Sequence, residues 1–215
     1  MSGAAGAAAK SDLAWSMMPH PAAPVGSGET VAGLVLAAGA GRRYGMPKAL
    51  VEVGGRLLVE RARATLHEAG CAPVVVVLGA GAPEVRSRAD LADATVVVNS
   101  GWASGMGSSL RAGLAALEPT GVDAVVVMLV DTPGVSAQAV RLVLAYAGPA
   151  ALVTATYHGQ PGHPVLLGRA HWTGAAASAV GDTGARGYLS ARADQVTRVP
   201  CDAVADGADL DEPVA

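Results

Sequence analysis

"GLVLAAGAGRRYGMPKALVEVGG", residues 33–55, joins an apolar run to a loop that is rich in glycine and in cationic side chains. The apolar run, residues 31–38, has the length of a buried strand. The loop contains the glycines Gly39, Gly41 and Gly45. Glycine permits a positive φ and exposes backbone N–H groups, while Arg43 and Lys48 can neutralise an anion bound by those groups. The stretch therefore predicts a strand that ends in a phosphate-binding loop.

Strands and helices alternate along the rest of the chain. Apolar, valine-rich runs predict strands at 31–37, 73–79, 94–99, 123–131 and 195–200, and two strands around a turn in 151–168. Helical spacing of apolar residues predicts helices at 56–70, 83–91, 108–117, 136–147 and 183–193. The alternation predicts a single-domain, Rossmann-like α/β fold, a three-layer sandwich around a mainly parallel sheet. Ligands of such sheets bind outside the carboxyl ends of the strands, so we expect the site in the loops 38–48, 79–83, 99–107 and 131–135.

The composition limits the classes of protein to consider. The 215 residues, of which 51% are hydrophobic, suit one domain, and the net charge of −3 predicts no nucleic-acid partner. The two cysteines form no C-x-x-C pattern, which favours a reducing cytoplasm, and no apolar stretch has the length of a membrane span. Residues 1–28 are rich in Ala, Gly, Pro and Ser, which predicts a disordered extension before a domain at 29–215.

Two common phosphate-binding loops do not fit the opening stretch. The dinucleotide fingerprint needs G-x-G-x-x-G, whereas the glycines here are spaced G-x-G-x-x-x-G with two arginines between them. The Walker loop needs glycine before its lysine and a hydroxyl after it, whereas Lys48 lies between Pro47 and Ala49. A third design fits these residues, in which backbone N–H groups hold a triphosphate and arginine and lysine neutralise it.

The stretch LAAGAGRRYGMPK resembles the L-A-[AG]-G-x-[GS]-x-R-[MF]-G-x-x-K signature of nucleotidyltransferases, in particular molybdenum cofactor cytidylyltransferase and the related guanylyltransferase. Four later segments resemble that family in the same order: NSGWASGMGSSLRAG (99–113), LVDTPGV (129–135), GQPGHPVLL (159–167) and GDTGAR (181–186). The resemblance covers roughly residues 31–212 and implies a nucleotide-diphospho-sugar transferase-like fold. It also implies that an acceptor oxygen attacks the α-phosphorus of a nucleoside triphosphate and releases pyrophosphate. Molybdopterin would be the acceptor, with a molybdoenzyme apoprotein as a further candidate partner.

The resemblance gives the opening loop specific roles. Arg43 and Lys48 are expected to stabilise the charge that develops on the departing pyrophosphate, whereas Arg42 is expected to point elsewhere. The residues expected around the nucleotide are Leu36, Ala37, Ala38, Gly39 and Gly41. Within the resembling group L-A-A-G accompanies cytidine and L-A-G-G guanosine. Ala38 therefore favours CTP, by the roughly 1–3 kcal/mol that one methyl group can supply.

Asp131 ends the longest predicted strand, where a carboxylate is costly to bury without a partner. A Mg²⁺ ion that bridges Asp131 to the phosphates would supply this partner, and a helix cap or a surface turn is the alternative. The family places another metal ligand near the C-terminus, where ADLDEPVA (208–215) offers Asp211 first and Asp209 second. This segment departs from the family pattern because its threonine is absent and Glu and Pro are exchanged.

The remaining candidates each carry a structural alternative. Gly79 either approaches the base or forms a plain turn, and Trp102 either joins the core or stacks on a ring. The start of the helix after the third strand can hold an anionic acceptor or the nucleotide through Gly105, Met106 and Ser109, with Asn99 bracing the loop.

His163 is expected in the turn of a hairpin, with a structural role or a role in acceptor binding. Asp182 and Arg186 form either an ion pair at a helix start or a contact to the phosphate of the acceptor.

Several functions remain open at this level. The first is transfer of CMP from CTP to molybdopterin cofactor, and the second is the same chemistry with GTP or with another small acceptor. A non-catalytic protein that delivers the cofactor is a third. A nicotinamide-dependent oxidoreductase is a fourth, and it would need the dinucleotide spacing that the loop lacks.

Overall fold

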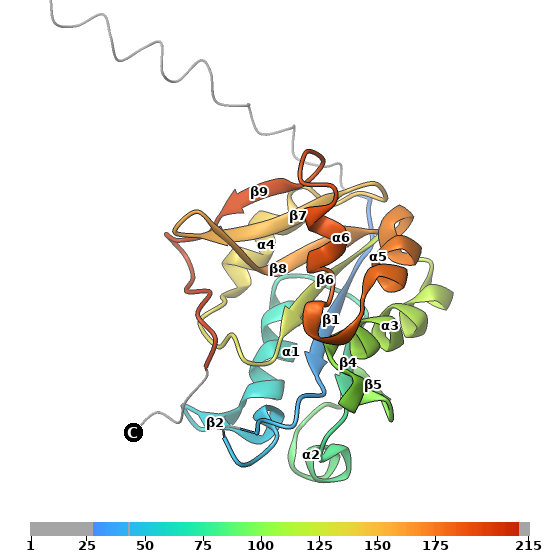
Figure 1. The fold of residues 1–215 in the computed structure, drawn as a ribbon. Helices are drawn as coiled ribbons and strands as arrows, with labels where there is room; N and C mark the ends of the chain where they lie inside the picture. Colours follow the sequence, from blue (N-terminus) through green and yellow to red (C-terminus); the bar gives the residue numbers. More distant parts are fainter. Residues whose placement is uncertain (1–27, 43, 211–215) are drawn as a thin grey trace, which may run out of the picture.

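The computed structural model describes residues 28–42 and 44–210, which build a central sheet covered by helices (Figure 1). The strands of this sheet are β1 (Val31–Ala37), β4 (Val74–Leu78), β5 (Ala94–Val98), β6 (Ala124–Leu129), β7 (Leu152–Tyr157), β8 (Gln160–Gly168) and β9 (Thr197–Pro200). They lie in the order β5-β4-β1-β6-β8-β7-β9, and β8 runs antiparallel to both of its neighbours while the other pairs are parallel. The predicted α/β class with a mainly parallel sheet is confirmed.

The chain reverses its direction of travel across the sheet beside β1. From β1 it proceeds outward through β4 to β5, and it then returns to form β6 on the other side of β1. The strands that follow β1 in the chain therefore lie first on one side of it and then on the other. This reversal opens a crevice at the carboxyl ends of β1 and β6. The loops that follow these two strands carry Lys48 and Asp131.

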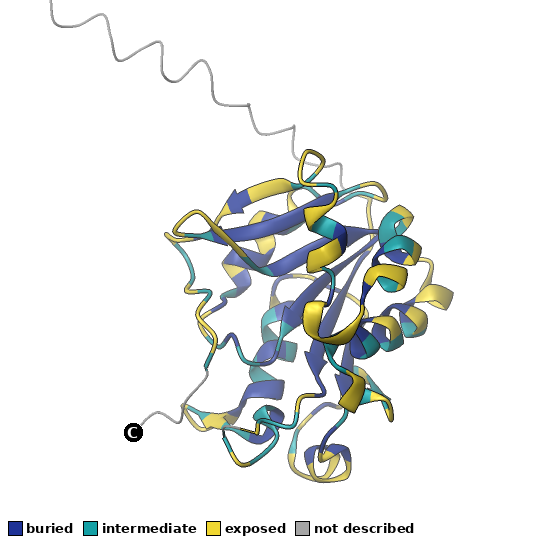
Figure 2. Ribbon diagram, in the orientation of Figure 1, coloured by how far each residue is buried: buried dark blue, intermediate teal, exposed yellow. Residues whose placement is uncertain are grey.

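Helices cover both faces of the sheet. They are α1 (Leu58–Glu68), α2 (Ala82–Arg88), α3 (Met106–Leu117), α4 (Ala137–Leu144), α5 (Trp172–Ser178) and α6 (Arg186–Ser190). Alternate residues of β1 point to opposite faces: Val35 packs in the cluster with α1 and α4, while Leu34 and Leu36 pack in the cluster with α3, α5 and α6. Every residue of β1 is buried, as the dark central strands in Figure 2 illustrate.

Small residues let these layers approach closely. A Cβ at Gly113 of α3 would lie 2.4 Å from Leu34 Cδ1, and a Cβ at Gly33 would lie 3.0 Å from Leu66 Cδ1 of α1. The helices therefore pack directly on the valine-rich sheet, which compensates for a composition without phenylalanine.

Several predicted helices and strands lie at the observed positions in the chain but differ from the observed elements in length. The predicted helix 56–70 begins only at Leu58, because Arg56–Leu57 forms the strand β3 that pairs with β2 (Glu52–Val53). Ser136 caps α4, since its hydroxyl accepts the N–H of Ala139. The sequence analysis did not predict α5, whose Ala- and Gly-rich sequence has little helical periodicity.

Short 3-10 helices connect several of these elements. They are η2 (Lys48–Leu50), η3 (Trp102–Ser104), η4 (Glu118–Thr120), η5 (Arg169–His171) and η6 (Gly181–Thr183). None of the helices in the described ranges is long and apolar enough to cross a membrane. Residues 1–27 lie outside the described residues, so the predicted extension stays a prediction.

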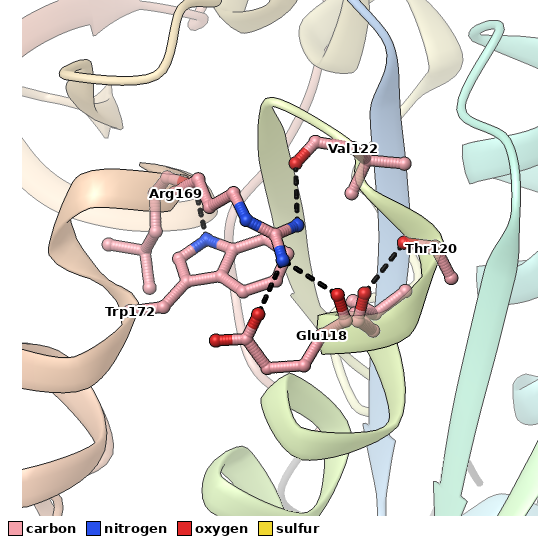
Figure 3. A network of polar contacts seen from close by, with 7 residues as sticks. Glu118, Thr120, Val122, Arg169 and Trp172 are labelled. Atoms are coloured by element: carbon pink, nitrogen blue, oxygen red, sulfur yellow. Dashed lines mark hydrogen bonds and ion pairs between the residues drawn. The ribbon is translucent and has the colours of Figure 1, made fainter.

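Arg169, in η5, links η4 to α5 (Figure 3). Its guanidinium donates to the backbone oxygens of Val122 and Glu118, and it also pairs with the Glu118 carboxylate. The same guanidinium lies 5.0 Å from the ring centroid of Trp172, a side chain that is 2% exposed and donates to the Leu167 carbonyl. The Arg169 side chain thus donates to two backbone carbonyls and covers the ring of Trp172.

We predict that Arg169→Ala lowers the free energy of unfolding by about 1–2 kcal/mol, because two carbonyls lose a charged donor and Trp172 loses its cation. The melting temperature should fall by roughly 2–8 °C for a domain of this size. Arg88→Ala is the matched control, since Arg88 forms only an exposed i,i+4 pair with Glu84 and should change stability by less than about 0.5 kcal/mol. Equal effects of the two variants in denaturant titrations would contradict this assignment.

Candidate functional site

A cavity of about 440 Å³ lies at the carboxyl ends of β1 and β6. Its lining comes from the ends of these strands, from the glycine-rich loop and from the start of α3: Leu36, Ala38, Gly39, Ala40, Arg42, Lys48, Trp102, Ala103, Ser104, Gly105, Met106, Ser109, Leu129, Val130, Asp131 and Asp182. We call this space the loop cavity. Its position is the one that a reversal of strand order predicts for a ligand site.

The backbone of the glycine-rich loop is folded tightly. Gly41 and Gly45 have φ of 58° and 71°, and a Cβ at Gly41 would lie only 1.9 Å from the Met46 carbonyl oxygen. The Tyr44 N–H donates to the Gly41 carbonyl at 2.8 Å, which closes the turn. Gly39 differs, because nothing would lie within 4 Å of a Cβ there, so its backbone faces open space beside the cavity. The loop ends in η2, which carries Lys48 into the cavity wall.

Lys48 and Asp131 form an ion pair across the cavity. Lys48 Nζ lies 2.8 Å from Asp131 Oδ2, and the two side chains are 17% and 22% exposed. The expectation that Asp131 lacks a protein partner is therefore wrong, because the loop after β1 brings a cation to the end of β6. The expectation that Lys48 and Asp131 belong to one site agrees with this contact.

The C-terminal segment is hydrogen-bonded to the backbone of the loop that contains Asp131. The Leu210 N–H donates to the Asp131 carbonyl at 2.7 Å, and the Asp206 N–H donates to the Gly134 carbonyl at 3.1 Å. Asp209 therefore belongs to a segment that is hydrogen-bonded to the end of β6. Asp211, the preferred second ligand, lies outside the described residues.

These carboxylates suit a hard divalent cation, which prefers oxygen ligands. Asp131 would hold it, with Asp209 supplying further oxygen from the segment that is hydrogen-bonded to the loop after β6. Within residues 28–42 and 44–210 there is no group of three or more His, Cys, Asp or Glu side chains close enough to bind a metal by themselves. Phosphate oxygens or water would have to complete the coordination.

The start of α3 is held by polar contacts that the sequence predicted only in outline. Asn99 Nδ2 donates to Ser108 Oγ at 2.7 Å and to Ser109 Oγ at 3.1 Å, so Asn99 does brace this loop. The Met106 N–H donates to Asp182 Oδ1 at 3.2 Å. A carboxylate thus accepts a hydrogen bond at the helix start where an anionic ligand was expected.

Close approach of two backbones explains the glycine before α3. Gly105 has φ of 105°, and a Cβ there would lie 2.4 Å from the Gly181 carbonyl carbon. A Cβ at Gly107 would similarly lie 2.4 Å from the Ala179 carbonyl oxygen. The loop 179–185 is therefore packed against the start of α3, and this contact brings Asp182 into the wall of the loop cavity.

Trp102 also lines the loop cavity, and Gly79 makes room for it. A Cβ at Gly79 would lie 2.5 Å from Trp102 Cβ and 2.7 Å from the Ala38 carbonyl oxygen. Gly79 itself does not line the cavity. The geometry gives Gly79 a role that was not predicted, since it is neither a base contact nor a plain turn but a close-packing position beside Trp102.

A second, larger cavity of about 580 Å³ adjoins the first, and we call it the sheet cavity. Leu36, Met106, Leu129 and Asp182 line both cavities and form a shared wall. The other residues of the sheet cavity are Leu110, Val127, Thr154, Gln160, Pro161, Gly162, His163, Val165, Thr183, Gly184, Ala185, Arg186, Leu189, Ser190, Ala193, Val196 and Arg198. Several of these positions lie in the segments 159–167 and 181–186, but only His163 and Arg186 among them were predicted as site residues, and the others come from separate elements.

His163 lies in β8 and not in the turn of the hairpin, which corrects the prediction. The turn is formed by His158 and Gly159, whose φ values are 50° and 76°. Burial lowers the pKa of His163 to about 4, and Arg186 acts in the same direction while Asp131 opposes it. The imidazole is therefore uncharged at neutral pH in the wall of the sheet cavity.

Asp182 and Arg186 both line the sheet cavity, but they form no ion pair with each other in the described part of the chain. Asp182 accepts from Met106 instead, and Arg186 opens α6. The proposed helix-start ion pair is thus absent from these residues, whereas the alternative, that both face a ligand space, agrees with the geometry.

Two residues at the end of β1 and in the loop after it differ from their expected positions. Ala37 is 1% exposed and packs in the core on the α1 and α4 face, so its side chain does not line the loop cavity as expected. Arg42, expected to point elsewhere, lines that cavity. Arg43 lies outside the described residues, so its role stays a prediction.

The reversal of strand order, the glycine-rich loop and the Lys48–Asp131 pair define a nucleotidyltransferase-type α/β protein. Residues 33–202 match the model of the MobA-like NTP transferase domain. The chain therefore belongs to the family of MobA-like NTP transferase domains.

The proteins that are similar to this chain carry different names. The chain is 40% identical over 189 residues to nicotine blue oxidoreductase of Paenarthrobacter nicotinovorans, with coverage of 84% of this chain and 92% of that protein. It is 31% identical to the solved structure of an Rv0371c homolog from Mycobacterium sp. strain JC1, with a TM-score of 0.74 over 85% of this chain and 90% of that one. Rv0371c of Mycobacterium tuberculosis H37Rv, solved in complex with manganese, is 27% identical with a TM-score of 0.71 over 86% of this chain and 94% of that one.

We predict that Gly79→Ala lowers the free energy of unfolding by about 1–3 kcal/mol, because the new methyl group overlaps Trp102 and the Ala38 carbonyl. Gly39→Ala is the control, since its methyl group would meet nothing within 4 Å and should leave stability nearly unchanged. Denaturant titrations of both variants, with tryptophan fluorescence as the probe, measure the difference. A destabilised Gly39→Ala beside an unchanged Gly79→Ala would contradict the packing role.

Proposed function

We propose that this protein transfers a nucleoside monophosphate, with CTP as the preferred donor, to a molybdopterin-type acceptor and releases pyrophosphate. The observation that carries the proposal is the pair of adjoining cavities with a shared wall. The loop cavity has the glycine-rich loop, Lys48 and Asp131 for a triphosphate, and the sheet cavity has space for an acceptor. A donor and an acceptor in these cavities would meet at the wall formed by Leu36, Met106, Leu129 and Asp182.

In the proposed reaction, an oxygen of the acceptor phosphate forms a bond to the α-phosphorus. The bond from that phosphorus to the bridging oxygen breaks, and the oxygen keeps the electron pair as part of pyrophosphate. Lys48, together with Arg43, would stabilise the negative charge that develops on this leaving group. N–H groups of the glycine-rich loop would hold the outer phosphates, and the attacking phosphate needs no base because it is already ionised.

A divalent cation, which we propose to be Mg²⁺, would be held by Asp131 and by Asp209 or Asp211, and it would neutralise phosphate charge. In the structure Asp131 is paired with Lys48. Binding of nucleotide and cation would therefore have to break this ion pair. The phosphates would then contact Lys48, and the cation would contact Asp131.

The choice of CTP depends on Ala38 at the cavity wall. Ala38 is 7% exposed, so its methyl group takes up part of the space next to the strand end. A larger purine would need that space, which supports the smaller pyrimidine. The nearest alternatives are GTP as the donor and another small phosphorylated molecule as the acceptor. GTP stays an alternative because one methyl group discriminates only modestly between nucleotides.

A second candidate function is reduction of a planar organic substrate. The observation that favours it is the 40% identity to a protein named nicotine blue oxidoreductase. The loop does not have the glycine spacing of the dinucleotide fingerprint, which is why we place this function second. A delivery protein that binds nucleotide and cofactor without turnover is a third possibility and would show binding alone.

We predict that pyrophosphate is released from CTP, and more slowly from other nucleoside triphosphates, when Mg²⁺ and molybdopterin cofactor are both present. A coupled pyrophosphate assay with each of the four triphosphates measures this. Parallel reactions with NADH or NADPH and a quinone-type dye test the reductase. Oxidation of the nicotinamide without any pyrophosphate release would replace the transferase by the second candidate.

We predict that Lys48→Ala and Asp131→Asn each lower the transfer rate by about 10²-fold or more, because each removes a charge that faces the phosphates. Both variants should stay folded, since both side chains line the loop cavity, where water can solvate the remaining charge. Arg56→Ala, in the exposed part of β3, is the control for loss of a surface cation. Near-normal turnover of either variant would place the reaction elsewhere.

We predict that Ala38→Gly shifts the ratio of kcat/KM for CTP over GTP toward GTP by roughly tenfold, because the methyl group no longer fills the space beside the base. Gly39→Ala is the companion variant, since it adds a methyl group to the neighbouring residue and should lower turnover with both nucleotides. If the ratio in Ala38→Gly equals that of the natural sequence, Ala38 does not read the base.

A further inference from the structure

A C-terminal segment, residues 201–210, joins the edge strand β9 to the loop after β6, and we call it the strap (Figure 1). The strands β6, β7 and β9 run in the same direction, because β8 is antiparallel to β6 and β7 while β9 is parallel to β7. Their carboxyl ends therefore lie on one edge of the sheet, and the strap follows this edge. At its start the Cys201 N–H donates to the Thr156 carbonyl of β7 at 3.0 Å, and at its end the Leu210 N–H donates to the loop after β6 at 2.7 Å.

The strap ties the loop that contains Asp131 to a distant part of the chain. Within that loop the Val135 N–H donates to the Thr132 carbonyl at 3.2 Å, which is a local contact that closes a turn. The strap adds two hydrogen bonds, one to the carbonyl of Asp131 and one to the carbonyl of Gly134. A displaced strap would release this backbone, and the Asp131 carboxylate at the wall of the loop cavity would move with it.

Tyr157, the last residue of β7, holds the middle of the strap. Its ring lies against the backbone of Gly207, where a Cβ would be 2.3 Å from Cδ2 and 2.4 Å from Cε2 of the ring. Gly207 has no positive φ, so the ring and not the backbone conformation excludes a side chain at this position. The Tyr157 hydroxyl donates to the His163 carbonyl of β8 at 2.8 Å. The Tyr157 side chain therefore joins the strap to the hairpin formed by β7 and β8.

We propose that Tyr157 is a positioning residue for the divalent-cation site, because its contact with Gly207 fixes the strap and thereby the backbone of Asp131. Tyr157 lines neither cavity, so it acts through the strap and not on the ligands. The strap also carries Asp209, the expected second ligand, so its position affects both carboxylates. The proposal rests on the proposed function in one respect, namely that Asp131 holds the cation. Changes to groups that orient a metal ligand from outside typically weaken metal affinity by roughly 10–100-fold.

Mn²⁺ is the probe, because its paramagnetic resonance signal distinguishes free from bound ion in the full-length protein without any turnover. We expect Gly207→Ala to weaken Mn²⁺ binding at least tenfold, because the new methyl group overlaps the Tyr157 ring and displaces the strap.

Gly174→Ala is the matched control, because its methyl group would lie 2.5 Å from Cε2 of Tyr188 and Gly174 also has no positive φ. Tyr188 packs in the cluster with α3 and α5, whereas Leu210 of the strap packs against the cluster with α1 and α4, on the other face of the sheet. Both variants disturb a contact between glycine and tyrosine, but only Gly207→Ala should change the affinity for Mn²⁺.

Variants of Tyr157 identify its ring as the group that holds the strap. Tyr157→Leu should weaken Mn²⁺ binding about tenfold, and Tyr157→Phe should lose much less affinity because it keeps the ring. Tyr157→Leu combined with Gly207→Ala should bind Mn²⁺ more tightly than Gly207→Ala alone, since the smaller side chain leaves room for the methyl group. Losses that simply add in the combined variant would contradict a direct contact and overturn the proposal.

Hydrogen exchange of the metal-free protein reports on the strap directly. In Gly207→Ala the amides of Asp206 and Leu210 should exchange at least tenfold faster than in the natural sequence, because they lose their carbonyl partners. Gly174→Ala should not accelerate these two amides. Natural exchange rates of the strap in Gly207→Ala, or equal Mn²⁺ affinities of the two glycine variants, would overturn the proposal.

The outcomes also separate this proposal from the proposed function. Mn²⁺ binding that depends on Gly207 and Tyr157, without pyrophosphate release from any triphosphate, would support the positioning role and reject the transferase. Pyrophosphate release together with Mn²⁺ binding that Gly207→Ala leaves unchanged would overturn the positioning role and leave the transferase in place. A natural sequence that binds no Mn²⁺ would overturn the positioning role together with the cation role of Asp131.

Discussion

Burial of β1 on both faces is the constraint on which the rest of this structure depends. The strand pairs in parallel with β4 on one side and with β6 on the other, and none of its seven residues is exposed. Such a strand is stable only if helices cover both faces, and each crossover then returns the chain to the same edge of the sheet. Polar side chains are excluded from the faces and collect in the loops at the carboxyl edge. The site is thus a consequence of how the strands are buried.

The small residues of the chain extend this constraint to the helices. Since the sequence has no phenylalanine, the space between the layers is closed by direct contact, as between Gly113 and Leu34. The same principle operates at the site, where Gly105 and Gly107 let the loop 179–185 approach the start of α3 and bring Asp182 to the shared wall. Glycines in the core and at the site therefore have the same effect, because each lets another part of the chain come close to its backbone.

The sequence was sufficient for the strands of the main sheet, for most of the helices and for the loops that carry the site, because these depend on local periodicity and on strand direction. It was insufficient where a residue depends on a distant partner. Asp131 was expected to lack a protein partner, but its partner Lys48 lies 83 positions away. His163 was placed in a turn because glycine and proline flank it, yet pairing between β7 and β8 keeps it in a strand. The sheet cavity was missed for the same reason, since its walls combine strands and helices that no single motif connects.

A nucleotidyltransferase fold and a relative named as an oxidoreductase are compatible in a site of this shape. Both activities bring a nucleotide against a second molecule, and both require the two to meet at a fixed boundary. Transfer needs the α-phosphorus at the shared wall, with charges such as Lys48 and Asp131 on the phosphate side. Reduction needs an electron donor beside the second substrate. It is therefore the charged end of the loop cavity that favours transfer.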